Sequence, residues 1–199
     1  QPTPTRVQPQ EAIHVLTANI GIENCGSVRP KQLKDIQTWI EDIGRPNILL
    51  LQEFMGGVDM ELLARNLGYV DWVRGHSQRP RSTQALLSDY PLNKVDVLPL
   101  PTEENARALS AIAEVHGKRL LICSVHLPSL RRKLRENSNQ VFTPLSIISL
   151  VAQEIWGKTE QTEHTRRLLK WIQSKSWDAA VIGGDFNTFF PTKAIRLIG

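Results

Sequence analysis

The pattern of hydrophobic and polar positions contains four apolar runs, each closed by polar or charged side chains. The runs and their closing residues are 13–19 with Asn19, 47–53 with Glu53, 120–126 with His126, and 180–187 with Asp185 and Asn187. A short, continuous apolar run is typical of a strand buried in a sheet. Polar groups at the ends of such strands stand on a rigid scaffold and can converge. The pattern therefore predicts strands that deliver reactive groups to a shared site.

The fourth run carries a paired glycine, Gly183-Gly184, immediately before Asp185-Phe186-Asn187. Glycines remove side-chain bulk, which lets a ligand approach the backbone. If the strand continues, its alternation places Asp185 and Asn187 on the same face. Gly, Asp and Asn also dominate ordinary turns. This segment alone is equally consistent with a site that binds phosphate and metal and with a turn.

Apolar residues at helical or strand-like spacing predict further elements. The expected helices are 30–43, 59–67, 143–156 and 163–174, and the expected further strands are 69–73, 85–87, and a hairpin of 108–116 with 118–127 that turns at Gly117. A polar loop is expected over 75–83, and Pro91, Pro99 and Pro101 punctuate the chain that follows. Strands interspersed with a few helices, in hairpins as well as crossovers, indicate a mixed α/β or α+β domain.

Length and composition fit one globular domain, because the chain has 199 residues, 41% of them hydrophobic, and a net charge of +4. Residues 1–10 are expected to form a flexible leader or linker, which assigns the domain to 11–199. A first residue other than Met gives a slight preference for an exported chain, periplasmic or extracellular, although a cloned fragment would look the same. The apolar helical stretch 145–152 is too short to span a bilayer, so we expect a soluble chain.

Positive charge is concentrated in the second half of the chain. Residues 101–199 carry 14 basic and 9 acidic side chains, against 10 and 11 in residues 1–100. The densest cluster, 131–135, fits a loop that grips a polyanion and, equally, a solvated surface loop. Cys25 and Cys123 can pair only if the fold brings them together. We expect free thiols, with Cys123 a small buried residue.

Five short motifs follow one another in the order of a known family. They are Leu16-Thr17-Ala18-Asn19-Ile20, Leu50-Leu51-Gln52-Glu53, Ala85-Leu86-Leu87-Ser88-Asp89-Tyr90-Pro91, Ser124-Val125-His126-Leu127 and Gly183-Gly184-Asp185-Phe186-Asn187. In these motifs the chain resembles the DNase-I-like endonuclease/exonuclease/phosphatase superfamily, whose members are metal-dependent enzymes that cleave phosphate esters. The resemblance implies a four-layer α/β/β/α sandwich, in which two sheets lie face to face with helices outside.

Glu53 closes so apolar a strand that an unpaired, buried carboxylate would be costly there, which leaves a metal ion, a basic partner or solvent. The resemblance makes Glu53 the principal Mg²⁺ ligand, and Asn19 a second ligand, directly or through water. Hard oxygen ligands suit Mg²⁺, with Mn²⁺ as the alternative ion. A lone Asn at a strand end is otherwise a turn former.

The resemblance also gives roles to the residues of the second half. His126 would contact the scissile phosphate or protonate the leaving oxygen, as suits a group that titrates near neutrality. Asp185 would orient and deprotonate the attacking water, and Asn187 would hold a phosphate oxygen and help to stabilise the transition state. Arg107 resembles an arginine that contacts phosphate in some members, although an arginine at a strand end is usually only solvated.

One motif of the superfamily, Ser-Asp-His on a last strand, has no counterpart after Asn187, so we expect the domain to be incomplete at its C-terminal side. The sequence predicts a Mg²⁺-dependent hydrolase of phosphate esters, favouring a phosphodiesterase or nuclease that acts on nucleic acid. Sphingomyelin and phosphoinositides are the alternative substrates. A catalytically incomplete module that binds phosphate is the alternative function, and the oligomeric state stays open.

Overall fold

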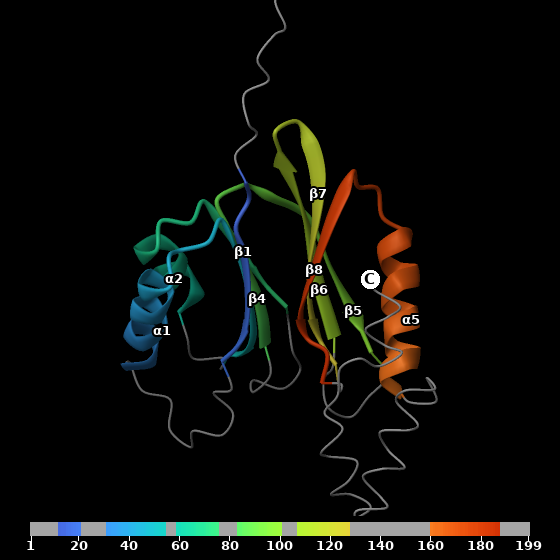
Figure 1. The fold of residues 1–199 in the computed structure, drawn as a ribbon, viewed down its shortest axis with the longest axis horizontal. Coiled ribbons are helices and arrows are strands. Elements are labelled where there is room, and N and C mark those ends of the chain that lie inside the picture. The colour runs from blue at the N-terminus through green and yellow to red at the C-terminus, as the bar shows by residue number, and fades with distance from the viewer. Residues whose placement is uncertain are drawn as a thin grey trace, which may run out of the picture.

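The chain folds into two four-stranded sheets with helices on their outer sides (Figure 1). This computed structural model describes residues 12–20, 31–54, 59–75, 83–100, 107–127 and 160–187. The predicted helix 143–156, the basic cluster 131–135, most of the predicted loop 75–83, Pro101 and Cys25 lie outside these ranges. Within the described part of the chain, no helix has both the length and the apolar composition needed to cross a bilayer.

The first sheet has the strand order β1-β2-β4-β3. Its strands are β1 (Val15–Asn19), β2 (Ile48–Phe54), β3 (Asp71–Arg74) and β4 (Thr83–Ser88), and its helices are α1 (Lys31–Asp42) and α2 (Met60–Asn66). β1 and β2 are parallel, whereas β4 runs antiparallel to both β2 and β3. The predicted helices 30–43 and 59–67 are confirmed, and α2 begins at an N-cap in which Asp59 accepts from the backbone N–H of Leu62.

The second sheet has the order β5-β6-β7-β8. Its strands are β5 (Leu92–Pro99), β6 (Arg107–Val115), β7 (Lys118–His126) and β8 (Ala179–Asp185), and α5 (Glu160–Gln173) precedes β8. The hairpin of β6 and β7 turns at Gly117, as predicted. Sequence reasoning missed β5, because Pro91 immediately precedes it and Pro99 is its last residue. β5 is an edge strand, and only edge strands and strand ends tolerate proline so readily.

Three apolar layers hold the sandwich together. The outer layer of the first sheet is formed by Leu49, Leu51 and Leu87 against α1 and α2. The central layer includes Ile48, Leu50, Leu109 and Ile122 from the two facing sheets. The third layer packs Leu121, Cys123 and Val125 on Leu168 and Ile172 of α5. The expected four-layer α/β/β/α architecture is therefore confirmed, with alternate residues of each strand facing opposite layers.

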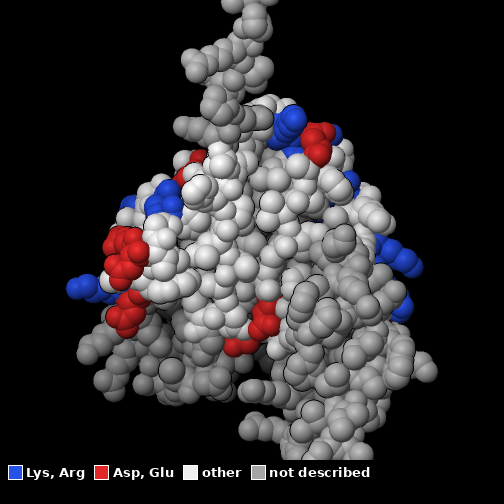
Figure 2. Space-filling model, in the orientation of Figure 1, with Lys and Arg blue, Asp and Glu red and all other residues white. Residues whose placement is uncertain are grey.

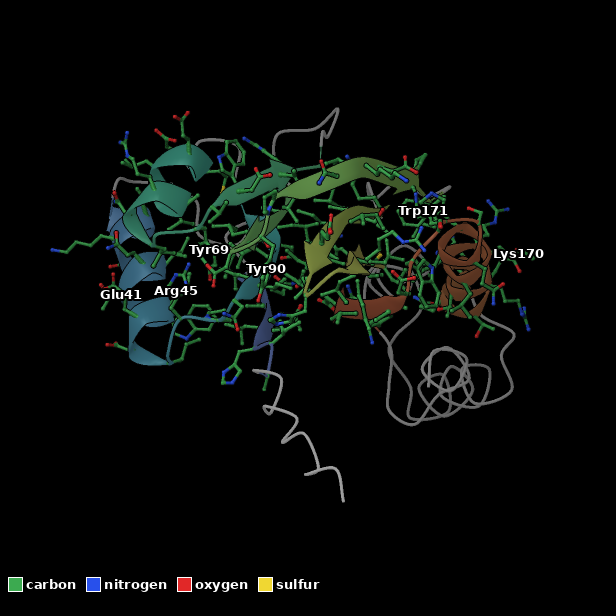
Figure 3. The ribbon with its side chains drawn as sticks, turned by 90° about the horizontal axis from the view of Figure 1, so that it is seen from above. Glu41, Arg45, Tyr69, Tyr90, Lys170 and Trp171 are labelled. Atoms are coloured by element: carbon green, nitrogen blue, oxygen red, sulfur yellow. The ribbon has the colours of Figure 1, made fainter. Side chains whose placement is uncertain are left out.

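Polar contacts add direction to the docking of α5. Trp171 Nε1 donates to Asp96 Oδ2 of β5 at 3.1 Å, and Lys175 Nζ reaches the same oxygen at 2.6 Å. Lys175 also lies over the Trp171 ring, 4.1 Å from its centroid. Figure 3 shows Trp171 on the side of α5 toward β5 and Lys170 on the outer side. The helix therefore presents one defined face to the sheet.

Candidate active site

Strand register in the second sheet puts three polar residues in one row. Arg107 of β6 pairs with His126 of β7, and His126 pairs with Asp185 of β8. Residues directly opposite each other in neighbouring strands project from the same face. In β7 that face is shared with Leu120 and Ile122, which belong to the central layer. The row therefore faces the first sheet.

The first sheet contributes Asn19 and Glu53, from the ends of the parallel strands β1 and β2. Asn19 pairs with Gln52 in this register. Strict alternation would turn Glu53 outward with Leu51, toward the helices. Glu53 instead has a φ of 53°, and the β2–β4 register shifts between Leu51 and Phe54. This irregularity re-aims the carboxylate into the gap between the sheets.

Direct contacts join the two sheets at this point. His126 Nε2 lies 3.2 Å from Glu53 Oε1, and Asn19 Nδ2 donates to Asp185 Oδ2 at 2.7 Å. Ligand atoms of Glu53, His126 and Asp185 all lie within 4.8 Å of one another. The side chains of Glu53 and His126 keep 19% and 12% of their surface exposed. Two carboxylates and an imidazole thus converge at a site that solvent can still reach.

Electrostatics at the site favours the ionised form of Glu53. The hydrogen bond from His126 is the largest cause that lowers the Glu53 pKa, and the hydrogen bond from Asn19 and the charge of His126 also lower it, against the opposing effect of burial. Burial lowers the pKa of the half-buried Arg107 below its ordinary value, yet an arginine keeps its charge at neutral pH. The site therefore holds an anionic Glu53 with Arg107 in the same row as His126.

Asn187 reaches the site by a turn rather than by strand alternation. β8 ends at Asp185, and Asn187 has a left-handed φ of 46°. Its backbone N–H donates to Asp185 Oδ1 at 2.8 Å, and its Nδ2 donates to the carbonyl of Leu127 at 2.8 Å. This turn orients the Asp185 carboxylate from the side opposite Asn19. An amide has two N–H donors, so the bond to Leu127 uses only one of them.

The paired glycines serve packing within the protein, which corrects the expectation that they clear space for a ligand. A Cβ on Gly183 would come within 2.7 Å of Leu50 Cδ1 across the central layer. A Cβ on Gly184, whose φ is 140°, would overlap the backbone of Val125 in β7. The glycines therefore let β8 approach its neighbours closely enough to bring Asp185 to the site.

The residues present fit a hard divalent cation. Two carboxylates at such short range repel each other, and among the described residues the ion-pair partner of Glu53 is a histidine rather than an arginine or lysine. The amide of Asn19 donates to both carboxylates. It therefore lies beside both of them, where a bound cation would relieve their repulsion. Carboxylate and amide oxygens suit Mg²⁺ or Mn²⁺.

The family model described as the Endonuclease/Exonuclease/phosphatase family matches residues 16–196. The chain belongs to this family. Its members are metal-dependent phosphoesterases and nucleases, which agrees with the convergence of acidic and amide groups described above. The sequence-based assignment to the superfamily is thereby confirmed. Among curated proteins, none matches the chain.

Solved structures of other proteins share the fold. TDP2 from C. elegans aligns with a TM-score of 0.61 and 17% identity, over 89% of this chain and 48% of that one. D. rerio TDP2 complexed with a single-strand DNA product gives 0.63 and 17%, over 89% and 61%. The human Nocturnin catalytic domain with bound sulfate gives 0.62 and 18%, over 92% and 67%. The chain thus spans about half to two thirds of the structures it matches.

Sequence reasoning selected residues that the fold brings together, and it missed the polar residues beneath them. Asn19, Glu53, His126 and Asp185 meet directly; Arg107 stands beside His126 in the row and Asn187 one turn beyond Asp185. The missed residues are Gln52, Gln84 and Ser124, which are buried between the sheets. Their signal in the sequence is a polar residue at an inward position of an apolar strand. Of the cysteines, Cys123 is a free, buried thiol, and burial raises its pKa to about 12.

Proposed function

We propose that this chain hydrolyses phosphodiesters in a Mg²⁺-dependent reaction, with nucleic acid as the favoured substrate. The observation that carries the proposal is the meeting of Glu53 with His126, and of Asn19 with Asp185, across the gap between the sheets. Substrate identity and the choice of Mg²⁺ over Mn²⁺ go beyond what family membership establishes. The other substrate classes to be tested are sphingomyelin and phosphoinositides.

In this proposal Glu53 and Asn19 hold the ion, which supplies charge neutralisation at the phosphate. Asp185 accepts the proton of the attacking water while the water oxygen forms its bond to phosphorus. Asn19 and the Asn187 backbone donate to the two Asp185 oxygens, and this fixes the plane of the carboxylate. A carboxylate oxygen has a second lone pair with which to take a proton. The residue therefore has the orientation that a general base requires.

His126 gives a proton to the leaving oxygen as the ester bond to phosphorus breaks, or else contacts a phosphate oxygen. Its ring nitrogen Nε2 lies 3.2 Å from Glu53 Oε1, which holds the imidazole at the site. Arg107, opposite His126 in the register, contributes a guanidinium to the same end of the sheet. The second N–H of Asn187 is the neutral donor proposed for a phosphate oxygen.

Support for nucleic acid comes from the basic second half of the chain and from the DNA product named for the D. rerio TDP2 structure. Figure 2 shows that the visible described face is largely uncharged, with Lys and Arg mostly at its margins. The densest basic cluster, 131–135, lies outside the described residues. The preference for nucleic acid therefore rests on charge and analogy, and the experiment must compare substrates.

The decisive assay follows hydrolysis of plasmid DNA, a single-stranded oligonucleotide, bis-p-nitrophenyl phosphate, sphingomyelin and a phosphoinositide, with Mg²⁺, Mn²⁺ or EDTA. Asp185→Asn is expected to lower the rate by about 10²–10⁴-fold, the scale of losing a general base. Asp178→Asn is the matched control, because Asp178 is exposed and pairs with Arg119 away from the site. An Asp185→Asn variant as active as the parent would refute the proposed role of Asp185.

The alternative function, a module that binds phosphate without turnover, is motivated by the share of its structural neighbours that the chain spans. Calorimetric titration with Mn²⁺ separates the two functions. Binding of Mn²⁺ that is lost in Glu53→Gln, without hydrolysis of any of the five substrates, would support the module. Metal-dependent hydrolysis that EDTA abolishes would support the enzyme.

A further inference from the structure

A buried polar layer crosses between the sheets directly beneath the site. It consists of Gln52 from β2, Gln84 from β4 and Ser124 from β7, whose exposed fractions are 1%, 1% and 0%. The surrounding central layer is apolar. Polar groups in such a place are costly unless they are hydrogen-bonded, so the contacts of these residues indicate what they do.

Both glutamines of the first sheet reach the same residue of the second sheet. Gln52 Nε2 donates to Ser124 Oγ at 2.9 Å and also lies 3.2 Å from Thr17 Oγ1. Gln84 Nε2 donates to the carbonyl of Ser124 at 3.3 Å and to the carbonyl of Arg107 at 3.1 Å. Side chain and backbone of Ser124 are thus both bonded to the facing sheet.

These bonds lie next to the site residues along the chain. Gln52 immediately precedes Glu53, and Ser124 lies two residues before His126 on the same face of β7. The second acceptor of Gln84 belongs to Arg107, the register partner of His126. The bonds therefore connect the strands that carry Glu53, His126 and Arg107.

The site needs such a connection because it is divided between the sheets. Asn19 and Glu53 stand on one sheet, whereas His126 and Asp185 stand on the other. Apolar packing is non-directional and allows small relative shifts of two sheets, whereas a hydrogen bond weakens steeply when its distance or angle changes. An offset of about 1 Å between the sheets is enough to misplace reacting groups.

The layer is imperfect as a source of stability. Among the described residues, none donates a hydrogen bond to the buried Gln84 Oε1, and an unsatisfied acceptor in a core carries a penalty. A leucine or methionine would fill the same space without that penalty. Gln84 is costly for packing, yet it is bonded to the backbone beside the site. This combination indicates a role in positioning the two sheets.

We propose that Gln52, Gln84 and Ser124 are positioning residues that fix the offset of the two sheets at the site. They hold Glu53 against His126. They also keep β6, the strand of Arg107, in a fixed position relative to these two residues. The catalytic meaning of this geometry rests on the proposed function, whereas the geometry itself does not. The experiment therefore needs readouts that are independent of hydrolysis.

The test uses Gln52→Met, Gln84→Met and Ser124→Ala, with Ser110→Ala as the matched control. Ser110 is as buried as Ser124 and lies on the adjacent strand, but its hydroxyl has no hydrogen-bond partner among the described residues. Three quantities are measured: the Mn²⁺ dissociation constant by calorimetry, the NMR signals of the His126 ring in metal-free protein, and the urea midpoint of unfolding. The urea midpoint identifies any variant that fails to fold.

Each of the three variants is expected to shift the His126 ring signals and to weaken Mn²⁺ binding about tenfold, the scale of one lost hydrogen bond. Ser110→Ala is expected to change neither. Because Gln52 and Ser124 share a bond, the double variant should also weaken binding about tenfold, instead of the hundredfold that independent sites would give. Gln84→Met is the most direct test, since Gln84 is far from His126 in sequence and can change the ring signals only through the contact between the sheets.

The proposal is overturned if folded Gln52→Met, Gln84→Met and Ser124→Ala keep parental His126 signals and Mn²⁺ affinity, or if Ser110→Ala changes them equally. Failure of the proposed function has a different signature. If the parent chain binds no Mn²⁺ and hydrolyses nothing, the proposed function is wrong, and the His126 signals of the metal-free variants still decide the positioning role.

Discussion

Acidic groups lie near both ends of strand β2, and their bonding partners differ between the two ends. At its start lies the Arg45 cluster, which comprises Arg45, Asn47, Tyr69 and Asp89. At its other end lies the site, formed by Asn19, Glu53, His126 and Asp185. Figure 3 shows Arg45 and Tyr69 beside the helices of the first sheet. The clusters differ in what neutralises the acid and in how many sheets hold it.

In the Arg45 cluster, the acid has a permanent cation, and protein groups bind most of the N–H donors of that cation. The Arg45 guanidinium pairs with both oxygens of Asp89, donates to the carbonyls of Leu67 and Gly68, and lies 4.1 Å from the centroid of the Tyr69 ring. Asn47 Nδ2 also donates to Asp89, at 3.0 Å. These contacts tie the chain around the first sheet and engage four of the five N–H groups of the guanidinium.

At the site, the acids are held by an amide and an imidazole and are divided between the two sheets. The Asn19 amide orients a carboxylate without cancelling its charge, and an imidazole is not a permanent cation, so the anionic oxygens keep their attraction for a metal ion. Burial and bonding of an acid therefore do not by themselves distinguish a structural role from a functional one. The distinction lies in whether a fixed cation already occupies the place.

The largest expected effect is the loss of activity in Glu53→Gln at the site. Hydrolysis should fall by about 10²–10³-fold, the scale of losing one electrostatic group of an active site. The free energy of unfolding in EDTA should change by less than about 1 kcal/mol, because the change also removes the repulsion between Glu53 and Asp185. Urea unfolding measures the stability and the hydrolysis assay measures the activity. A large loss of stability would contradict the prediction, because Glu53 would then hold the fold together as Arg45 does.

Arg45→Met should give the opposite result. Removing the guanidinium leaves Asp89 partly buried without its cation, and we expect a loss of about 2–3 kcal/mol, less than for a fully buried pair because both side chains retain some exposure. Activity per folded molecule should stay at the parental value. Reduced activity in a fully folded Arg45→Met protein would contradict the separation of the two ends.

Tyr69→Phe probes the same cluster through pH. Burial raises the Tyr69 pKa to about 12, the nearby Asp89 also raises it, and Arg45 opposes them. An unfolded tyrosine releases its proton near pH 10, so the folded state retains a proton that the unfolded state has lost, and stability falls as pH rises from about 10 toward 12. The variant should lack this alkaline loss in urea titrations at pH 8 and pH 11.

At neutral pH, Tyr69→Phe should cost about 1 kcal/mol. It removes the hydroxyl that donates to the Pro46 carbonyl at 3.0 Å. The two effects have opposite signs, so the stability gap between the parent and the variant should narrow or reverse at pH 11. A gap that stays constant with pH would show that the Tyr69 hydroxyl ionises as readily in the folded chain as in the unfolded one.

The smallest effect is expected for Arg119→Met, which serves as the charge-matched control for Arg45→Met. Arg119 pairs with Asp178 at 2.9 Å, but both side chains are exposed, and solvent screens such pairs strongly. Neither activity nor the urea midpoint should change measurably. A loss as large as that of Arg45→Met would mean that loss of any arginine destabilises this fold, whatever its burial.

Much of the fold was predictable because it follows from periodic patterns. The apolar runs that become β1, β2, β7 and β8, the helical stripes of α1, α2 and α5, and the turn at Gly117 are each encoded within a few neighbouring residues. The order of five short motifs then indicated the family. β5 is not predicted because Pro91 before it and Pro99 at its end carry the local signature of a loop, and the place of β5 at a sheet edge makes Pro99 tolerable.

The site divides in the same way between local and tertiary information. The sequence by itself determined which chemical groups stand at the strand ends, since Asn19, Glu53, His126 and Asp185 each close an apolar run. Only the tertiary structure decided that Glu53 turns inward by a left-handed backbone, that the glycines serve sheet packing, and that Gln52, Gln84 and Ser124 join the sheets. The physical reason is that alternation along a strand is a local property, whereas register irregularities and contacts between sheets depend on residues far apart in the chain.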